Sequence, residues 1–209
     1  MPSTRLPLTV AFLVLLSLLL SGIAPYDRLT WMMETLPVMI ALPLLIKTYR
    51  QFRLTDMLYV LIGLHALVLI VGGAYTYARV PVGFDVQNLF GLDRNPYDKL
   101  GHLIQGFVPA LIAREILLRM RYLTSRRMTA FLCVAIALAI SAVYELIEWG
   151  AAVAMGQGAD EFLGTQGDVW DTQSDMLCAM IGAIVALLGL SRYHDRQMQS
   201  LEIHRRDEP

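Results

Sequence analysis

The chain has 209 residues, of which 56% are hydrophobic and 17% are charged, with a formal net charge of −1. A soluble domain has about 45–50% apolar and about 25% charged residues, so this composition is typical of an integral membrane protein. The near-neutral net charge argues against a nucleic-acid partner. Cys133 and Cys178 fall in different apolar segments without C-x-x-C spacing, so we expect neither a disulfide nor a zinc site.

The first apolar run covers residues 6–24 and follows a single arginine, Arg5. Gly22 and Ala24 resemble the small residues of a signal-peptide cleavage site, which makes a cleaved leader the alternative interpretation. Pro25 follows them directly, however, and the run is longer than a usual signal core. We therefore predict a retained membrane span.

The second and third spans are predicted at residues 31–46 and 54–77. Two prolines interrupt the second span, and neighbouring helices can tolerate the kinks that they cause. The third span ends in Tyr75 and Tyr77, which are expected as interfacial aromatics. His65 lies alone in its middle, where a hydrogen-bonded interhelical histidine is favoured over a proton relay.

The longest loop covers residues 78–96, and its apolar positions indicate that it lies on the membrane surface or packs on the bundle. Asn95-Pro96 is a cap followed by a proline expected at the first helical position, and it predicts the start of the next helix. The last three spans are predicted at residues 97–118, 128–154 and 171–190. The glycine-rich connection before the last span has no P-loop pattern.

The basic residues set the predicted orientation. With the N-terminus inside, 13 of the 17 fall on the inner side, and only Arg28, Arg79, Arg94 and Lys99 fall outside. The positive-inside rule then predicts six transmembrane helices with both termini cytoplasmic. We predict an all-α polytopic membrane helical bundle in the bacterial inner membrane, one integral membrane domain over residues 1–209. Residues 191–209 mix charges and are expected as a solvated cytoplasmic tail.

Acidic residues gather at the outer ends of the last three spans. Neighbouring positions on one helical face carry Asp98 and His102, Glu145 and Glu148, and Asp171 and Asp175. Four or five carboxylates cannot all stay ionised side by side in a low dielectric, so some must be protonated or a cation must neutralise them. Lys99, His102 or a divalent metal ion can supply that charge. We predict Asp98, His102 and Asp171 as metal ligands and Glu145, Glu148 and Asp175 as catalytic acids or bases.

Structural roles are the alternative for some of these residues. Asp98 in a first helical turn favours the helix dipole, and Asp168 and Asp171 have the spacing of a helix cap. Capping explains Asp175, Glu145 and Glu148 less well, because these residues lie deeper or at the other helix end. Elsewhere, Glu115 and Arg119 are expected to form an ordinary interfacial pair. Gly72-Gly73 predicts close helix packing.

The segments YDKLGHLIQGF, YELIEW and GTQGDVWDTQSDMLCAMIG resemble the YjdF family of bacterial inner-membrane proteins, and the resemblance extends over essentially the whole chain. More distantly, the chain is similar to the VanZ-like family, which implies a shared membrane architecture. The matching positions are Asp98, Lys99, His102, Glu145, Asp175 and Gly182. Glu148 and Ala179 stand where that family has Gln and Asn, which makes the cluster here more acidic.

Three functions stay open from the sequence. The first is a metal-dependent or acid/base site that acts on an envelope or lipid-linked molecule. The second is a transporter that couples to protons or cations, which would also need polar groups near mid-membrane. The third is a non-catalytic membrane interaction protein in which the cluster only holds helices together. The sequence identifies no substrate and leaves open whether the protein is an enzyme.

Overall fold

The computed structural model describes residues 4–155 and 166–206. All regular structure in these residues is helical, without strands. The helices are α1 (Arg5–Ser21), α2 (Arg28–Thr48), α3 (Asp56–Tyr75), α4 (Pro81–Phe90), α5 (Tyr97–Arg119), α6 (Arg126–Met155) and α8 (Asp171–Arg206).

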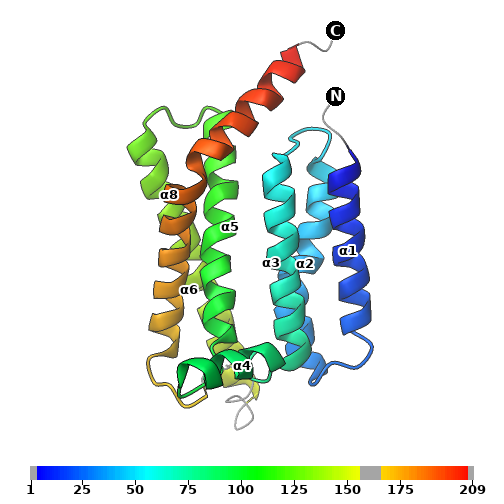
Figure 1. Ribbon diagram of the computed structural model, residues 1–209, viewed down its shortest axis with the longest axis vertical. Coiled ribbons are helices and arrows are strands. Elements are labelled where there is room, and N and C mark those ends of the chain that lie inside the picture. The colour runs from blue at the N-terminus through cyan, green and yellow to red at the C-terminus, as the bar shows by residue number, and fades with distance from the viewer. Residues whose placement is uncertain (1–3, 156–165, 207–209) are drawn as a thin grey trace.

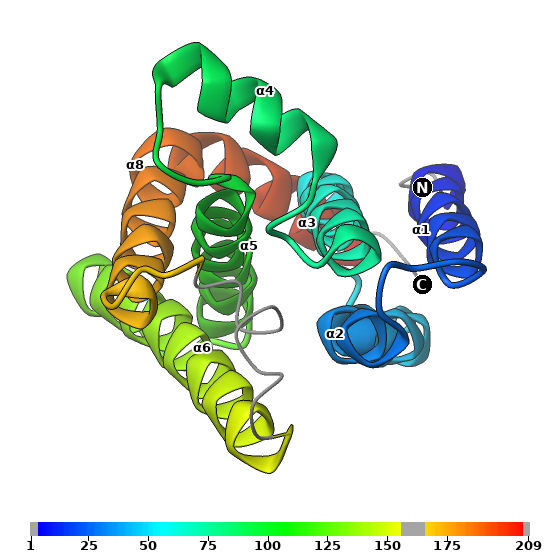
Figure 2. The same ribbon diagram turned by 90° about the horizontal axis from the view of Figure 1, so that it is seen from below.

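Two groups of three helices stand side by side (Figure 1). In the first group α1 and α2 both pack on α3, and in the second α5, α6 and α8 pack on one another. The two groups meet mainly where α3 contacts α5. Helix α4 lies crosswise at one end of the bundle, on the opposite side of α5 from α6 (Figure 2). We call this the α4 end, and the opposite end the Glu115 end.

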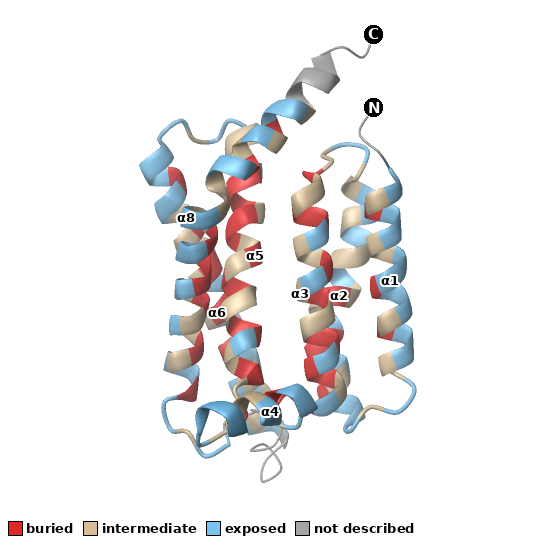
Figure 3. Ribbon diagram, viewed as in Figure 1, coloured by how far each residue is buried: buried red, intermediate tan, exposed pale blue. Residues whose placement is uncertain are grey.

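Among the described residues, five helices are long and apolar enough to cross a membrane: α2, α3, α5, α6 and α8. Helix α1 is equally apolar in character but has only 17 residues. Buried positions concentrate on α3 and α5, whereas α1 exposes most of its side chains (Figure 3). The prediction of an all-α membrane bundle is therefore confirmed. The loop predicted at residues 78–96 contains α4, which carries exposed apolar side chains such as Leu89 and Phe90.

Helix starts follow local capping signals. Asp27 precedes α2, and its carboxylate accepts a hydrogen bond of 2.7 Å from the Thr30 backbone N–H, which lowers the pKa of this exposed acid. Asn95 Oδ1 accepts from the backbone N–H of Tyr97 at 3.0 Å. The helix begins at Tyr97, so Pro96 is the residue before the helix and not its first residue as the sequence predicted.

Helices α5 and α8 cross at unusually small separation. A Cβ atom on Gly106 would overlap the backbone of Ala179, and one on Gly182 would overlap the backbone carbonyl of Leu103. Small residues at a helix crossing let the two backbones approach closely. This crossing brings the first turns of α5 and α8 together, and these turns carry most of the acidic residues singled out in the sequence.

The end of α3 turns back on itself. Thr76 and Tyr77 both have positive φ (55° and 49°), which is uncommon for residues other than glycine. The turn lays the Tyr77 ring against Gly72, and a Cβ on Gly101 of α5 would lie 2.9 Å from the same ring. The prediction that Tyr77 is an interfacial aromatic is therefore wrong, because it is 7% exposed, whereas Tyr75 is 45% exposed.

Glu115 is also more than the interfacial pair that the sequence predicted. It is fully buried at the Glu115 end, where it accepts hydrogen bonds from the backbone N–H (3.0 Å) and hydroxyl (2.8 Å) of Thr55. His194 Nε2 lies 2.8 Å from Oε2 of Glu115, and Arg119 donates to Oε1. The pairing with Arg119 exists, but the carboxylate joins three segments of the chain.

Two further expectations differ from the structure. The stretch after residue 190 continues as helix to Arg206, and His194 and Met198 within it are buried, so this part is packed rather than a solvated tail. His65 Nε2 is buried and has no hydrogen-bond partner among the described residues, so the hydrogen bond predicted for it is not formed there. Both cysteines are free, as expected.

Candidate functional site

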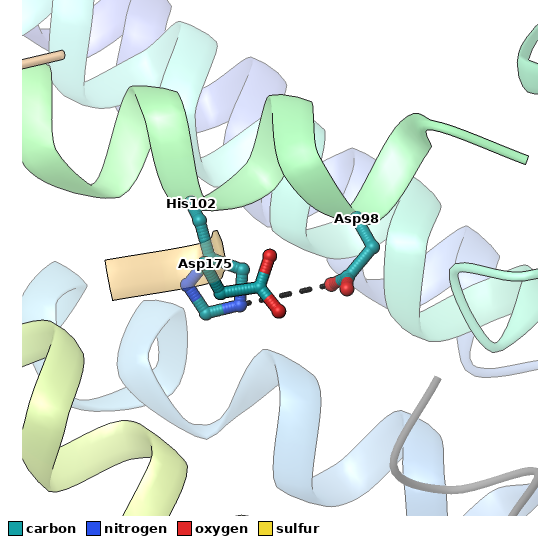
Figure 4. Close-up of side chains that lie close together, drawn as sticks. All are labelled: Asp98, His102 and Asp175. Carbon is teal, nitrogen blue, oxygen red and sulfur yellow. Dashed lines mark ion pairs between the residues drawn. The ribbon is translucent and has the colours of Figure 1, made fainter. Parts of the chain in front are cut away.

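Three buried side chains converge at the α4 end from two helices (Figure 4). Asp98 and His102 lie one turn apart on α5, and Asp175 lies one turn inside α8. One ligand atom from each lies within 4.8 Å of the other two. Ligands that share one metal ion at 2.0–2.6 Å are at most about 5 Å apart, so this spacing is compatible with a common cation.

Glu145 of α6 completes this group from a third helix. His102 Nε2 lies 3.4 Å from Glu145 Oε1 and 3.7 Å from Asp98 Oδ1. Neither separation is a well-formed hydrogen bond. Glu145 Oε1 is buried without a hydrogen-bond partner among the described residues. The imidazole therefore faces two carboxylates across gaps that a small cation or a water molecule can bridge.

Asp171 is held differently from Asp175. Lys99 Nζ binds both, at 2.7 Å from Asp171 and 2.8 Å from Asp175, and it also donates to the Ser174 hydroxyl. Arg94 forms a second ion pair with Asp171. Burial opposes the charge of Arg94, but its hydrogen bond to Asp171 and the nearby carboxylates outweigh this and raise its pKa. Asp171 is thus neutralised by two cations and lies outside the closest trio.

Helix α8 begins at Asp171, so Asp168 is not the helix cap with Asp171 three residues on that the spacing predicted, and its carboxylate closes the turn before the helix. Its Oδ1 accepts a hydrogen bond of 2.9 Å from the backbone N–H of Trp170, just before α8, and its Oδ2 lies 3.5 Å from Arg94. Asp160 and Glu161, in the glycine-rich connection before α8, lie outside the described residues.

A small cavity adjoins the trio between the two helix groups. Its volume is about 10 Å³, close to the space that one water molecule occupies. It is lined by Glu34, Leu69, Tyr77, Asp98, Gly101, His102, Gln105, Tyr144 and Glu148. Glu34, Leu69 and Tyr77 come from α2, α3 and the turn after α3, so the site extends beyond the three spans on which the sequence placed it.

Glu34 enters this cavity from α2. It is 4% exposed, and its Oε2 accepts a hydrogen bond of 2.6 Å from the Tyr144 hydroxyl of α6. Burial, together with the charges of Glu34 and Asp98, raises the pKa of Tyr77 well above its usual value. Tyr77 therefore stays a neutral phenol beside these acids.

The site has more negative than positive groups. Six carboxylates belong to it or line its cavity: Glu34, Asp98, Glu145, Glu148, Asp171 and Asp175. The fixed cations within reach are Lys99 and Arg94, both on the side of Asp171. Two further atoms, His102 Nδ1 and Gln105 Oε1, are buried without a hydrogen-bond partner in the described part of the chain. Such atoms are uncommon in native structures and indicate a missing water, ion or ligand.

The structure brings together residues that the sequence grouped by depth. His102, Glu145 and Asp175 lie close to one another, as their matched positions on consecutive spans predicted, while their roles stay predictions. Sequence reasoning did not assign Glu34, Tyr77, Tyr144 or Gln105 to the site. Glu34 had one signal, an acid inside an apolar span, but the helix opposite to it could not be read from the sequence.

Comparison with known proteins shows to which family the chain belongs. Residues 6–196 match the family described as predicted membrane protein (DUF2238). The chain belongs to this family. It is 61% identical over 191 residues to the inner membrane protein YjdF of Escherichia coli (strain K12), and the match covers 91% of each chain. No solved structure matches the chain.

Membership of the DUF2238 family agrees with the resemblance to the YjdF family found in the sequence. Together with the spans, it identifies an inner-membrane protein embedded in the lipid bilayer. Neither the family description nor the relative's name states an activity, so function has to be argued from the site.

Proposed function

We propose that this DUF2238 member holds a divalent metal ion at Asp98, His102 and Asp175 and uses it in acid/base chemistry on an envelope or lipid-linked molecule. The observation that carries the proposal is the convergence of two carboxylates and an imidazole within 4.8 Å, all buried. Carboxylate oxygens and imidazole nitrogens are common ligands of divalent metals.

The charge balance supports a cation at this place. Lys99 and Arg94 offset two of the six carboxylates, and a divalent ion would offset two more. Burial favours the neutral form of a further carboxyl group, whereas the hydrogen bond that Glu34 accepts from the Tyr144 hydroxyl favours the ionised form. A buried group of like charges without such compensation would be costly in a low dielectric.

The remaining acids suit supporting roles in this proposal. Glu145 lies 3.4 Å from His102 and has one oxygen without a partner among the described residues, so it is positioned to take a proton from a bound water. Glu148 lines the adjoining cavity and can serve the same step. Lys99 and Arg94 hold Asp171, which would fix the start of α8 and with it the position of Asp175.

We place the α4 end at the outer membrane face, with six spans and both termini in the cytoplasm, in a single membrane domain. The distribution of basic residues supports this orientation, and α1 packs along α3 as a sixth apolar helix. Reporter fusions after Arg127 and Arg192 should then report cytoplasm, and a fusion after Asp93 should report the outer side. A cytoplasmic signal after Asp93 would contradict the orientation.

A cation-coupled transporter is the second candidate. The observation that favours it is a pair of buried polar atoms near mid-helix without partners in the described residues, His65 Nε2 on α3 and Ser141 Oγ on α6. Transport sites commonly lie near the membrane midplane. Under this alternative the metal or proton at the α4 end would be the coupling ion, and both residues would be needed for uptake but not for metal binding.

Elemental analysis of the detergent-purified protein tests the metal site. We expect about one divalent ion per chain, lost on treatment with chelator and in the Asp175→Asn variant. Asp85→Asn is the matched control, because Asp85 is an exposed acid on α4 at the same end. Equal metal content in Asp175→Asn and Asp85→Asn, or no metal in the native protein after resupply, would reject the proposal and leave the cluster as a helix-packing network.

A further inference from the structure

The cavity at the α4 end is lined mainly by acidic and other polar side chains. Three carboxylates, two phenols, an imidazole and an amide face it, together with Leu69 and Gly101. Among the described residues that line it there is no lysine or arginine. Lys99 and Arg94 point instead to Asp171 on the α8 side of the site. A ligand that enters the cavity therefore meets acceptors and negative charge.

Two of the lining side chains have buried atoms that lack partners. His102 and Gln105 are 5% and 8% exposed and interact with each other, but neither His102 Nδ1 nor Gln105 Oε1 forms a hydrogen bond of good geometry with the described residues. An amide oxygen can only accept, so the unfilled position at Gln105 needs a donor. This observation is independent of the acids and points to a ligand that carries N–H or O–H groups.

The two helix groups close the cavity through one polar contact. The Tyr144 hydroxyl of α6 donates to Glu34 of α2 at 2.6 Å, and α2 and α6 are not otherwise closely packed. Glu34 is thus the carboxylate that the N-terminal group contributes. Tyr77 also hydrogen-bonds to this carboxylate, and because a carboxylate has about four acceptor positions, Glu34 can accept a further donor.

We propose that this cavity binds the ammonium group of a primary amine, with Glu34, Glu148 and Gln105 as acceptors.

The ammonium group fits the lining in charge, hydrogen bonding and size. It carries one positive charge and three donors and accepts nothing, which complements three acceptors around a space lined by no lysine or arginine among the described residues. The Tyr77 and Tyr144 rings line the same space, and aromatic faces attract ammonium ions. A volume of about 10 Å³ holds one water-sized group, and an ammonium head is of that order.

This site overlaps the proposed metal position but does not need a bound metal. Asp175 belongs to the metal trio but does not line the cavity, whereas Glu34 lines the cavity but is outside the trio. Asp98 and His102 belong to the metal trio and also line the cavity, so the two positions share these side chains. Amine binding is therefore measured in chelator, where loss of the metal proposal leaves the result unchanged.

Thermal unfolding of the purified full-length protein in detergent with chelator provides the test. The probes are methylammonium chloride, tetramethylammonium chloride and sodium chloride at equal ionic strength. We expect a concentration-dependent rise in Tm with methylammonium only, because ligand that binds the folded state stabilises it and tetramethylammonium has no N–H donor. Equal rises with all three salts, or no rise with methylammonium, would overturn the proposal.

Three variants test whether methylammonium binds in this cavity. Glu34→Gln keeps an acceptor for Tyr144 and should weaken methylammonium binding by about tenfold, as a charge-assisted hydrogen bond becomes a neutral one. Gln105→Met removes the unfilled acceptor at similar size and should weaken binding too, which keeps the test valid if Glu34→Gln does not fold. Asp85→Asn should bind as the native protein does. Unchanged affinity in Gln105→Met and in folded Glu34→Gln would reject this location.

The amine can belong to a lipid headgroup or to a small free molecule, and nanodiscs separate these sources. Phosphatidylethanolamine carries a primary ammonium, and phosphatidylcholine has no N–H donor. If the lipid is the source, nanodiscs with phosphatidylethanolamine should reduce the Tm rise caused by methylammonium, compared with phosphatidylcholine nanodiscs. An equal rise in both assigns the site to a free amine. A rise in neither lipid would overturn the proposal.

Discussion

Helix α5 carries a buried polar group at each end, and the two groups differ in how completely their atoms are paired. At the Glu115 end, both oxygens of Glu115 are occupied by Thr55, Arg119 and His194. At the α4 end, atoms of His102, Gln105 and Glu145 are buried without partners among the described residues.

The two ends of α5 also differ in how well their acidic side chains are balanced by basic ones. At the Glu115 end two acids face two arginines, with Arg119 paired to Glu115 and Arg114 to Asp195 at 2.6 Å. At the α4 end six carboxylates face Lys99 and Arg94. A buried network that is paired and neutral stabilises one arrangement of the helices, whereas an unpaired and charged one is stable only with a ligand or with bound protons. The comparison assigns stability to one end and binding to the other.

The largest expected effect comes from breaking the Glu115 end. Glu115→Ala leaves Arg119 and His194 without their buried acceptor and should lower the free energy of unfolding by about 3–5 kcal/mol. Unfolding by denaturant in detergent measures it. Asp56→Ala is the control, because Asp56 pairs with Arg53 at the surface (side chain 42% exposed) and should cost less than about 1 kcal/mol. Similar losses in the two variants would remove the distinction.

The next effect tests the crossing that connects the two ends. Gly182→Ala places a Cβ against the Leu103 carbonyl and should cost about 1–3 kcal/mol through overpacking, with a loss of metal binding because α8 shifts relative to α5. Gly189→Ala, on the same helix with nothing within 4 Å of its Cβ, should be neutral or slightly stabilising. Metal content retained in Gly182→Ala would show that the site does not need this close packing.

A smaller change in stability is expected at the α4 end, and whether it is an increase or a decrease should depend on bound metal. Glu148→Gln keeps shape and removes one charge, so it should change stability by less than about 1 kcal/mol. With chelator the variant should be slightly more stable than the native protein, because repulsion falls. With metal it should be slightly less stable, because a cation had offset that repulsion. Melting temperatures identical to the native protein under both conditions would leave Glu148 outside the charged group.

The smallest effect on stability is expected at Asp27, which belongs to neither polar group. It shows how much an exposed helix cap contributes to the free energy of unfolding. Its folded-state pKa is lowered, so its cap stabilises the fold above the unfolded value near 3.8 and loses this contribution as pH falls through the folded value. Asp27→Ala should cost about 0.5–1 kcal/mol at neutral pH and become indistinguishable from the native protein at low pH. A difference that grows on acidification would contradict the capping role.

The sequence by itself determined the helices and the polar face of the bundle. Apolar runs of about 20 residues specify helices in a bilayer because every backbone polar group must be paired within its own segment. The spacings of Asp98 with His102 and of Asp171 with Asp175 predicted shared faces because helical periodicity is local. These local rules could therefore identify five of the site's acids and its histidine.

Tertiary structure alone decided which of these groups touch. Glu34 meets Tyr144 across 110 positions of sequence, and Glu115 meets His194 across 79, so no local pattern connects them. Tyr77 reaches the cavity only because the end of α3 reverses direction against Gly72. Which helices contact one another depends on how the side chains of the whole bundle pack. In this protein the close crossing of α5 and α8 determines which polar groups meet. Periodicity predicts which face of a helix is polar, but packing decides what that face meets.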